Sequence, residues 1–85
     1  MTSKRKKADT ELGTRILRNM ARVIERERET RGLNKKEMAE LIDVTYPFYF
    51  QILDGTANPS LQTITRICLN LDVQFQELVT GAAPV

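Results

Sequence analysis

The side chains of this chain best suited to recognition chemistry lie between Thr45 and Gln51. The amide of Gln51 both donates and accepts, so it can bond N6 and N7 of an adenine, a pairing worth about 1–3 kcal/mol of discrimination. Tyr46 and Phe50 lie one helical turn apart, and their rings can touch thymine methyl groups. They can equally anchor a protein partner, because exposed aromatic residues mark interfaces. We favour a base contact for Gln51 over an ordinary solvated side chain, and both partners stay open for the two rings.

Catalytic chemistry has little support in the composition. The chain of 85 residues has no histidine and one cysteine, Cys68, which falls in an apolar stripe and is expected in the core. Zinc coordination and histidine-based proton transfer are therefore excluded. The sequence also lacks a glycine-rich phosphate loop and carboxylates paired in a plausible cleft. We predict no catalytic, metal-binding or cofactor-binding residue, and hence no enzyme.

Charge is unevenly divided along the chain. Residues 1–36 carry twelve Lys or Arg against five acids, a net charge of +7, whereas residues 37–85 carry one Arg against six acids, a net charge of −5. A basic first half favours a polyanionic partner, although solvated helix faces explain the same charges equally well. The basic run at 4–7 suits a flexible arm that enters a DNA minor groove, or a tail that only keeps the chain soluble.

Apolar periodicity and capping residues predict five helices. Asn34 and Glu37 form the pattern of a capping box. Thr45 is a good N-cap with Pro47 in the first turn of its helix, and Ser60 caps the next helix. The helices are expected at about 14–31, 34–42, 45–54, 60–71 and 75–79.

The segment joining the second and third of these helices has the spacing of a helix-turn-helix. Ala39 is small enough for close contact between helices, and Asp43 tolerates the positive φ of a tight turn. Apolar Met38 and Ile42 precede these two residues, and Ile52 lies where the second helix of the pair packs on the first. Such a crossing leaves one side of the second helix free for a partner.

The stretch from Arg31 to Val79 resembles the Xre/Cro/C1 family of phage and bacterial repressors. The matching residues are Gly32-Leu33-Asn34, Glu37-Met38-Ala39, Val44-Thr45, Gln51-Ile52-Leu53-Asp54-Gly55, Asn58-Pro59-Ser60-Leu61 and Leu69-Asn70-Leu71-Asp72-Val73. Asp43 stands where the family often has glycine, and Leu53 where it often has glutamate. We expect an all-α, five-helix, lambda repressor-like helix-turn-helix domain. It would occupy residues 12–80, with a flexible basic arm at 1–11 and a C-terminal tail at 81–85.

The resemblance also implies a mode of binding. Members bind double-stranded DNA, usually as homodimers on two-fold related half-sites, with the third helix in the major groove and the fifth helix in dimer contacts. Lys35 would lie near a phosphate or a base, whereas Phe48 and Tyr49 are expected in the core. The DNA-binding residues implied by position are Lys35, Lys36, Thr45, Tyr46, Pro47, Phe50 and Gln51.

These observations predict a sequence-specific transcriptional regulator that acts as a repressor. The alternative is a protein-interaction module of antitoxin type, which binds DNA weakly and docks on a protein partner through Tyr46 and Phe50. The absence of Lys and Arg between residues 37 and 65 motivates that alternative. No apolar run approaches the roughly 20 residues that cross a membrane, and none resembles a signal peptide. We therefore expect a cytoplasmic protein, encoded by a bacterium or a phage.

Overall fold

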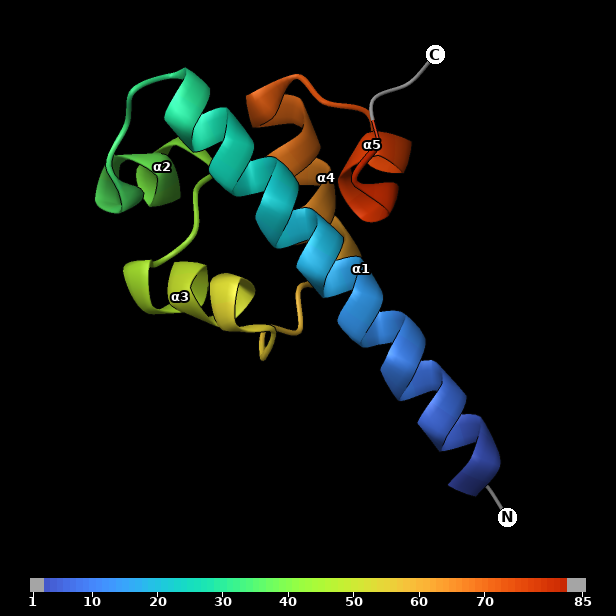
Figure 1. Ribbon diagram of the computed structural model, residues 1–85. Coiled ribbons are helices and arrows are strands. Elements are labelled where there is room, and N and C mark those ends of the chain that lie inside the picture. The colour runs from blue at the N-terminus through green and yellow to red at the C-terminus, as the bar shows by residue number, and fades with distance from the viewer. Residues whose placement is uncertain (1–2, 83–85) are drawn as a thin grey trace.

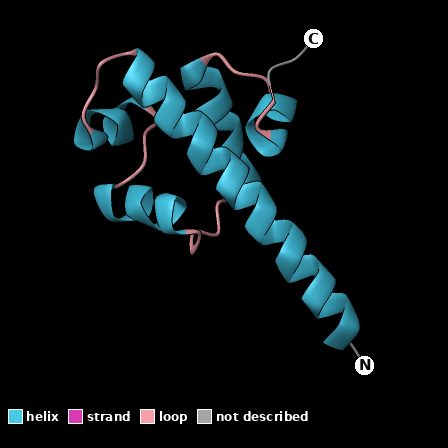
Figure 2. Ribbon diagram, in the orientation of Figure 1, coloured by secondary structure: helices cyan, strands magenta, loops and turns pink. Residues whose placement is uncertain are grey.

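The computed structural model describes the backbone of residues 3–82 and the side chains of residues 11–82. Within that range the chain forms five helices and no strand, as Figures 1 and 2 show. The all-α, five-helix prediction is confirmed. In Figure 1 α1 crosses the whole molecule, and α3 and α5 lie on different sides of it. The helices are α1 (Ser3–Thr30), α2 (Lys35–Leu41), α3 (Tyr46–Asp54), α4 (Leu61–Leu71) and α5 (Phe75–Thr80).

The first helix begins earlier than predicted. We expected a start at about Thr14, but α1 runs from Ser3, and its N-terminal half extends past the other helices (Figure 1). Residues 3–12 contain no proline and include Lys, Arg, Ala, Glu and Leu, all of which enter a helix at little cost. Gly13 alone is a poor helix former there, and one glycine costs only about 1 kcal/mol relative to alanine. Nothing local therefore ends the helix at the predicted place.

The sequence also predicted a division of the chain into an N-terminal arm, a helix-turn-helix domain and a C-terminal tail. A helical backbone at the N-terminal end does not test whether residues 1–11 act as a flexible arm. The division at residues 11 and 80 stays a prediction. Residues 83–85 of the predicted tail lie outside the described range.

The short helices begin at caps that the sequence predicted. The backbone N–H of Glu37 donates to the Asn34 side chain over 2.8 Å, and the Glu37 carboxylate accepts from the Asn34 backbone over 2.9 Å. This is a complete capping box at the start of α2. Thr45 accepts from the backbone N–H of Phe48 in α3, and Ser60 caps α4 in the same way. These caps set where each helix starts.

The turn between α2 and α3 has the backbone conformation predicted for Asp43. Its φ is +60°, in the left-handed region that aspartate tolerates. Arg66 of α4 donates to the Asp43 carbonyl over 3.2 Å, and its guanidinium lies 3.5 Å from the Asp43 carboxylate. The fourth helix therefore braces the turn that sets the angle between α2 and α3.

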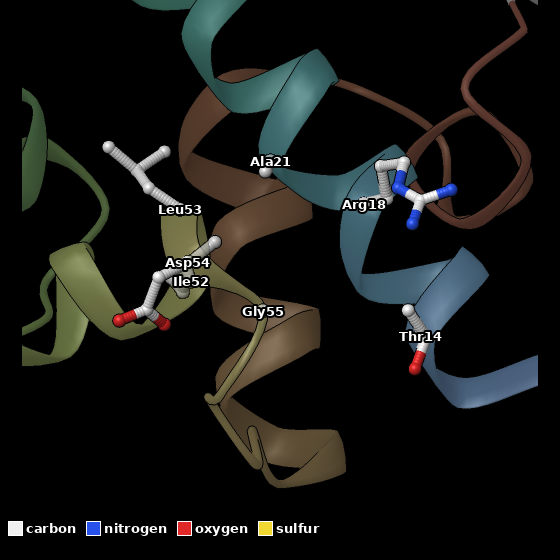
Figure 3. Close-up of a pocket in the computed structure, with 7 residues that line it drawn as sticks. All are labelled: Thr14, Arg18, Ala21, Ile52, Leu53, Asp54 and Gly55. Atoms are coloured by element: carbon white, nitrogen blue, oxygen red, sulfur yellow. The ribbon is translucent and has the colours of Figure 1, made fainter. Parts of the chain in front are cut away.

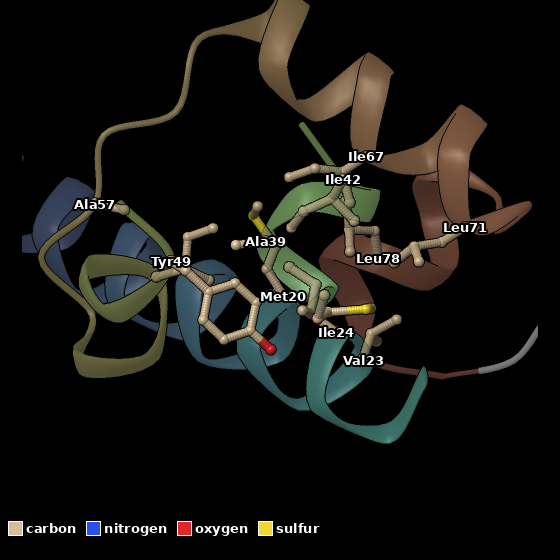
Figure 4. Packing of buried hydrophobic residues seen from close by; sticks show 12 residues of the cluster. Met20, Val23, Ile24, Ala39, Ile42, Tyr49, Ala57, Ile67, Leu71 and Leu78 are labelled. Atoms are coloured by element: carbon tan, nitrogen blue, oxygen red, sulfur yellow. The ribbon is translucent and has the colours of Figure 1, made fainter. Parts of the chain in front are cut away.

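A single apolar core joins the helices (Figure 4). Ala39 in α2 is almost completely buried, and Ile52 in α3 is fully buried. Small Ala39 lets the two helices approach closely, as the sequence predicted. The core residues are Met20, Val23, Ile24, Met38, Ala39, Ile42, Tyr49, Ile52, Ala57, Ile67, Leu71 and Leu78.

The predicted core aromatic residues differ in depth. Tyr49 is fully buried, so that prediction is confirmed, whereas Phe48 is half-buried and packs against the core. Cys68 also packs against the core from a half-buried position. Burial raises the pKa of the Cys68 thiol, which disfavours the reactive thiolate.

Replacing Asn34 by alanine tests the cap of α2. Because Asn34→Ala leaves the N–H of Glu37 without its acceptor, we expect the free energy of unfolding to fall by about 1 kcal/mol, measured by urea denaturation. Gln62→Ala is the control, since Gln62 is exposed within α4, and it should change stability by less than about 0.5 kcal/mol. Equal effects of the two substitutions would contradict the assigned cap.

Candidate nucleic-acid interface

The third helix has two chemically different sides. Tyr49 and Ile52 point into the core and are fully buried. Tyr46, Phe50 and Gln51 are exposed on the side that the core does not cover. Tyr49 and Ile52 are three residues apart and share the inner side. Tyr46 and Phe50 are four apart and share the outer side. The outer side of α3 is thus a fixed surface available to a partner, as the sequence predicted for a helix-turn-helix.

Tyr46 and Phe50 form an aromatic pair on this outer side. Their ring centroids lie 4.9 Å apart with the rings at 78°, an edge-to-face arrangement. The exposed fractions are 46% for Tyr46 and 41% for Phe50, so roughly half of each ring stays accessible. Phe50 also lies edge-on to buried Tyr49, with centroids 6.3 Å apart. The pair therefore packs on the core through the contact of Phe50 with Tyr49.

Polar groups flank the aromatic pair. Gln51 is exposed, and its side-chain amide forms no hydrogen bond with any other residue whose side chain is described. Both its donor and its acceptor are thus available to a ligand. Thr45 is exposed, and its hydroxyl oxygen already accepts from the backbone N–H of Phe48. Pro47 is exposed in the first turn of α3, where its missing N–H leaves no helical hydrogen bond unmade.

The two predicted lysines lie at the start of α2, in different settings. Lys35 places its Nζ 3.8 Å from a carboxylate oxygen of Glu25 on α1. Lys36 is exposed and forms no ion pair among residues 11–82. Lys36 is thus the freer cation for a phosphate, whereas Lys35 would have to share its charge with Glu25.

Sequence analysis missed the residue that holds this region together, which is Glu25. The Tyr49 hydroxyl donates to the Glu25 carboxylate, and Arg28 donates to it from Nε and Nη2 over 2.9–3.2 Å. Arg28 also donates to the Leu33 carbonyl over 2.8 Å. One carboxylate therefore links α1 to α3 and, through Arg28, to the loop before α2. The available clue was that a tyrosine expected in the core needs a partner for its hydroxyl.

The ionisation of this cluster follows from its contacts. Burial disfavours the charged form of Glu25, but hydrogen bonds from Arg28 and Tyr49 outweigh that effect and lower the pKa of the Glu25 carboxyl. Burial, together with the hydrogen bond to Glu25, raises the pKa of Tyr49. At neutral pH the cluster therefore holds an ionised carboxylate and a neutral phenol.

A small cavity lies between α1 and the end of α3 (Figure 3). Its volume is about 140 Å³, below the roughly 300 Å³ at which small-molecule pockets begin. Its charged groups are Arg18 and Asp54, which point in different directions in Figure 3.

No group of three or more potential metal ligands occurs in the part of the chain that the structure describes. No helix of that part is long and apolar enough to cross a membrane.

Comparison with known families agrees with this geometry. The sequence model described as helix-turn-helix, of the Xre/Cro/C1 type, matches residues 24–78, which include α2 to α4 and most of α5. The protein belongs to this family of DNA-binding helix-turn-helix regulators. No curated protein and no solved structure matches the chain.

Replacing Tyr49 by phenylalanine tests the Glu25 cluster. At neutral pH we expect Tyr49→Phe to lower the free energy of unfolding by about 1.5–3 kcal/mol, because a hydrogen bond to a charged group is lost. The lowered pKa of Glu25 means that its carboxylate stabilises the fold above its ordinary pKa, and that this contribution disappears as pH falls through the folded-state pKa. The effect of Tyr49→Phe should therefore shrink in acid.

Urea denaturation over a series of pH values measures this change. Tyr46→Phe is the matched control, since the same hydroxyl is removed from an exposed ring, and little effect is expected. A Tyr49→Phe effect that stays constant from neutral to acidic pH would contradict the assigned role of Glu25.

Proposed function

We propose that the protein is a sequence-specific, non-catalytic repressor of transcription that places α3 in the major groove of DNA. The observation that carries this proposal is the outer side of α3, where three neighbouring side chains are exposed on a helix whose opposite side is fully buried. Family membership supports the docking mode, because helix-turn-helix proteins insert the second helix of the motif into the major groove. Gln51 then reaches a base edge, and Thr45, Tyr46, Pro47 and Phe50 lie at or beside the contacted bases.

Cations on other helices supply the phosphate contacts. Lys36 and Lys35 lie at the start of α2, the helix that in this motif crosses the DNA backbone. The basic residues at 4–7 lie at the N-terminal end of α1 and would reach DNA as an arm. Each phosphate that these cations neutralise lowers the logarithm of affinity by about 0.9 per tenfold rise in salt. Affinity would come chiefly from these contacts and sequence preference from α3.

The proposed regulator acts as a homodimer on a two-fold symmetric site. A surface groove between α1 and α5 is lined by apolar Leu12, Ile16 and Val79 and by polar Arg15, Asn19 and Thr80, and Leu12 is 52% exposed. A groove that combines apolar and polar groups suits a second copy of the chain. Pairing would place two α3 helices on successive major grooves, as half-site recognition requires. A dimer of this kind would repress transcription by occupying a promoter. The protein would act in the bacterial cytoplasm and be encoded by a bacterium or by a phage.

The competing function is docking on a protein through the Tyr46–Phe50 pair. It shares the exposed rings but gives no role to Lys36, to the basic run at 4–7 or to the free amide of Gln51. DNA recognition uses all of these groups, and so it is the function we prefer. The two functions differ in their response to salt and to base sequence.

Replacing Gln51 by alanine tests specific recognition. We expect Gln51→Ala to weaken binding to the preferred duplex by about 5- to 150-fold for each half-site, since a bidentate amide–adenine pair is lost there. Binding to unrelated duplexes should change little. Fluorescence titration of both duplexes at two salt concentrations makes the measurement, with exposed Gln62→Ala of α4 as the control. A flat salt response, or equal affinity for every duplex, would exclude specific DNA binding.

A further inference from the structure

The outer side of α3 lacks the groups that recognise guanine and cytosine. Guanine is read chiefly by Arg or Lys, and cytosine by a carboxylate. Residues 45–53 include no charged side chain. Asp54, the last residue of α3, accepts from Thr56, and Arg66 of α4 pairs with Asp43. The uncharged middle of α3 therefore favours the bases of an A·T pair.

The exposed rings complement the chemistry of thymine. Among the ordinary DNA bases, only thymine presents an apolar group, its C5-methyl, in the major groove. The Tyr46 and Phe50 rings stand edge-to-face at 4.9 Å and together form an apolar surface one helical turn long. Gln51 follows Phe50 in α3 and is also exposed, about 100° further round the helix, so its amide borders this surface on one side. An amide for adenine and an apolar surface for thymine match adjacent A·T pairs.

The rings are also held in place before any partner arrives. Phe50 lies against Tyr49, whose hydroxyl is bonded to Glu25. Tyr46 in turn lies against Phe50. This chain of contacts fixes the rings relative to the core, and a preorganised surface loses little conformational entropy on binding.

We propose that α3 recognises the C5-methyl groups of pyrimidines through Tyr46 and Phe50, and so selects thymine beside the adenine bonded by Gln51. This inference rests on the DNA-binding function proposed above and names what that site prefers. A cytosine carrying a C5-methyl group presents the same apolar group in the groove and would be accepted better than plain cytosine at a contacted position.

Replacing thymine by uracil tests the proposal, because it removes only the methyl group. The probe is a short duplex, the tightest binder recovered from a pool of random sequence, made with thymine or with uracil at each position in turn. We expect about three- to fivefold weaker binding for each contacted methyl that is removed, since burial of one methyl-sized group is worth about that factor. A third form, with 5-methylcytosine replacing the contacted thymine and guanine replacing its adenine, should bind better than the same duplex with plain cytosine.

Substitutions at Tyr46 and Phe50 test whether the two rings cause the preference for thymine over uracil. Phe50→Ser and Tyr46→Ser should bind the thymine duplex more weakly than the wild-type protein does, and should no longer distinguish it from the uracil duplex. Leu69→Ser is the matched control, since Leu69 is 75% exposed on α4, and it should keep the preference for thymine.

Several outcomes would overturn the proposal. Equal affinity of the wild-type protein for thymine and uracil duplexes would do so, as would a recovered duplex that lacks thymine. A Phe50→Ser variant with unchanged preference for thymine would exclude the rings as its source. Failure of the proposed DNA-binding function is distinguishable, because then no duplex would be enriched from the pool and the thymine–uracil comparison would not arise.

Discussion

The bond between the buried Tyr49 hydroxyl and the Glu25 carboxylate is the constraint on which the rest of the recognition surface depends. A tyrosine can be fully buried only if its hydroxyl finds a partner, and Glu25 on α1 provides one. That contact fixes the rotation of α3 about its own axis. Tyr49 and Ile52, three residues apart, face inward, while Tyr46, Phe50 and Gln51 are exposed. The same carboxylate receives Arg28 and attracts Lys35, so the starts of α2 and α3 are positioned from one point on α1.

Much of this arrangement could be predicted because it is encoded locally. The caps at Asn34, Thr45 and Ser60 involve residues three apart, so a single sequence reveals them. The turn at Asp43 depends on a backbone preference of one residue. The start of α1 was placed too late, because residues 3–12 contain no proline and are mostly good helix formers, so the helix continues through them. The Glu25–Tyr49 contact joins residues 24 positions apart, so it appears only when the helices pack.

The candidate site likewise has features that the sequence predicted and features that appear only in the folded structure. The sequence resembled the helix-turn-helix family, the family match over residues 24–78 shows membership, and the structure adds which side of α3 is exposed. Lys35 illustrates what sequence position alone cannot supply, since its amine faces Glu25 as well as solvent. The aromatic pair is a second example, because its edge-to-face contact and its support by Tyr49 are tertiary features. Because residues 45–53 carry no charge, the proposed phosphate contacts fall to α2 and α1, so affinity and selectivity would come from different helices.

We propose that two copies of α3 read DNA at a symmetric site. The decisive measurement is selection of bound duplexes from a random pool by the full-length protein, followed by sequencing. We expect a two-fold symmetric consensus with A·T pairs in each half-site and with half-sites about one helical turn apart. Recovery of duplexes with no shared sequence, or with a consensus that lacks two-fold symmetry, would contradict it.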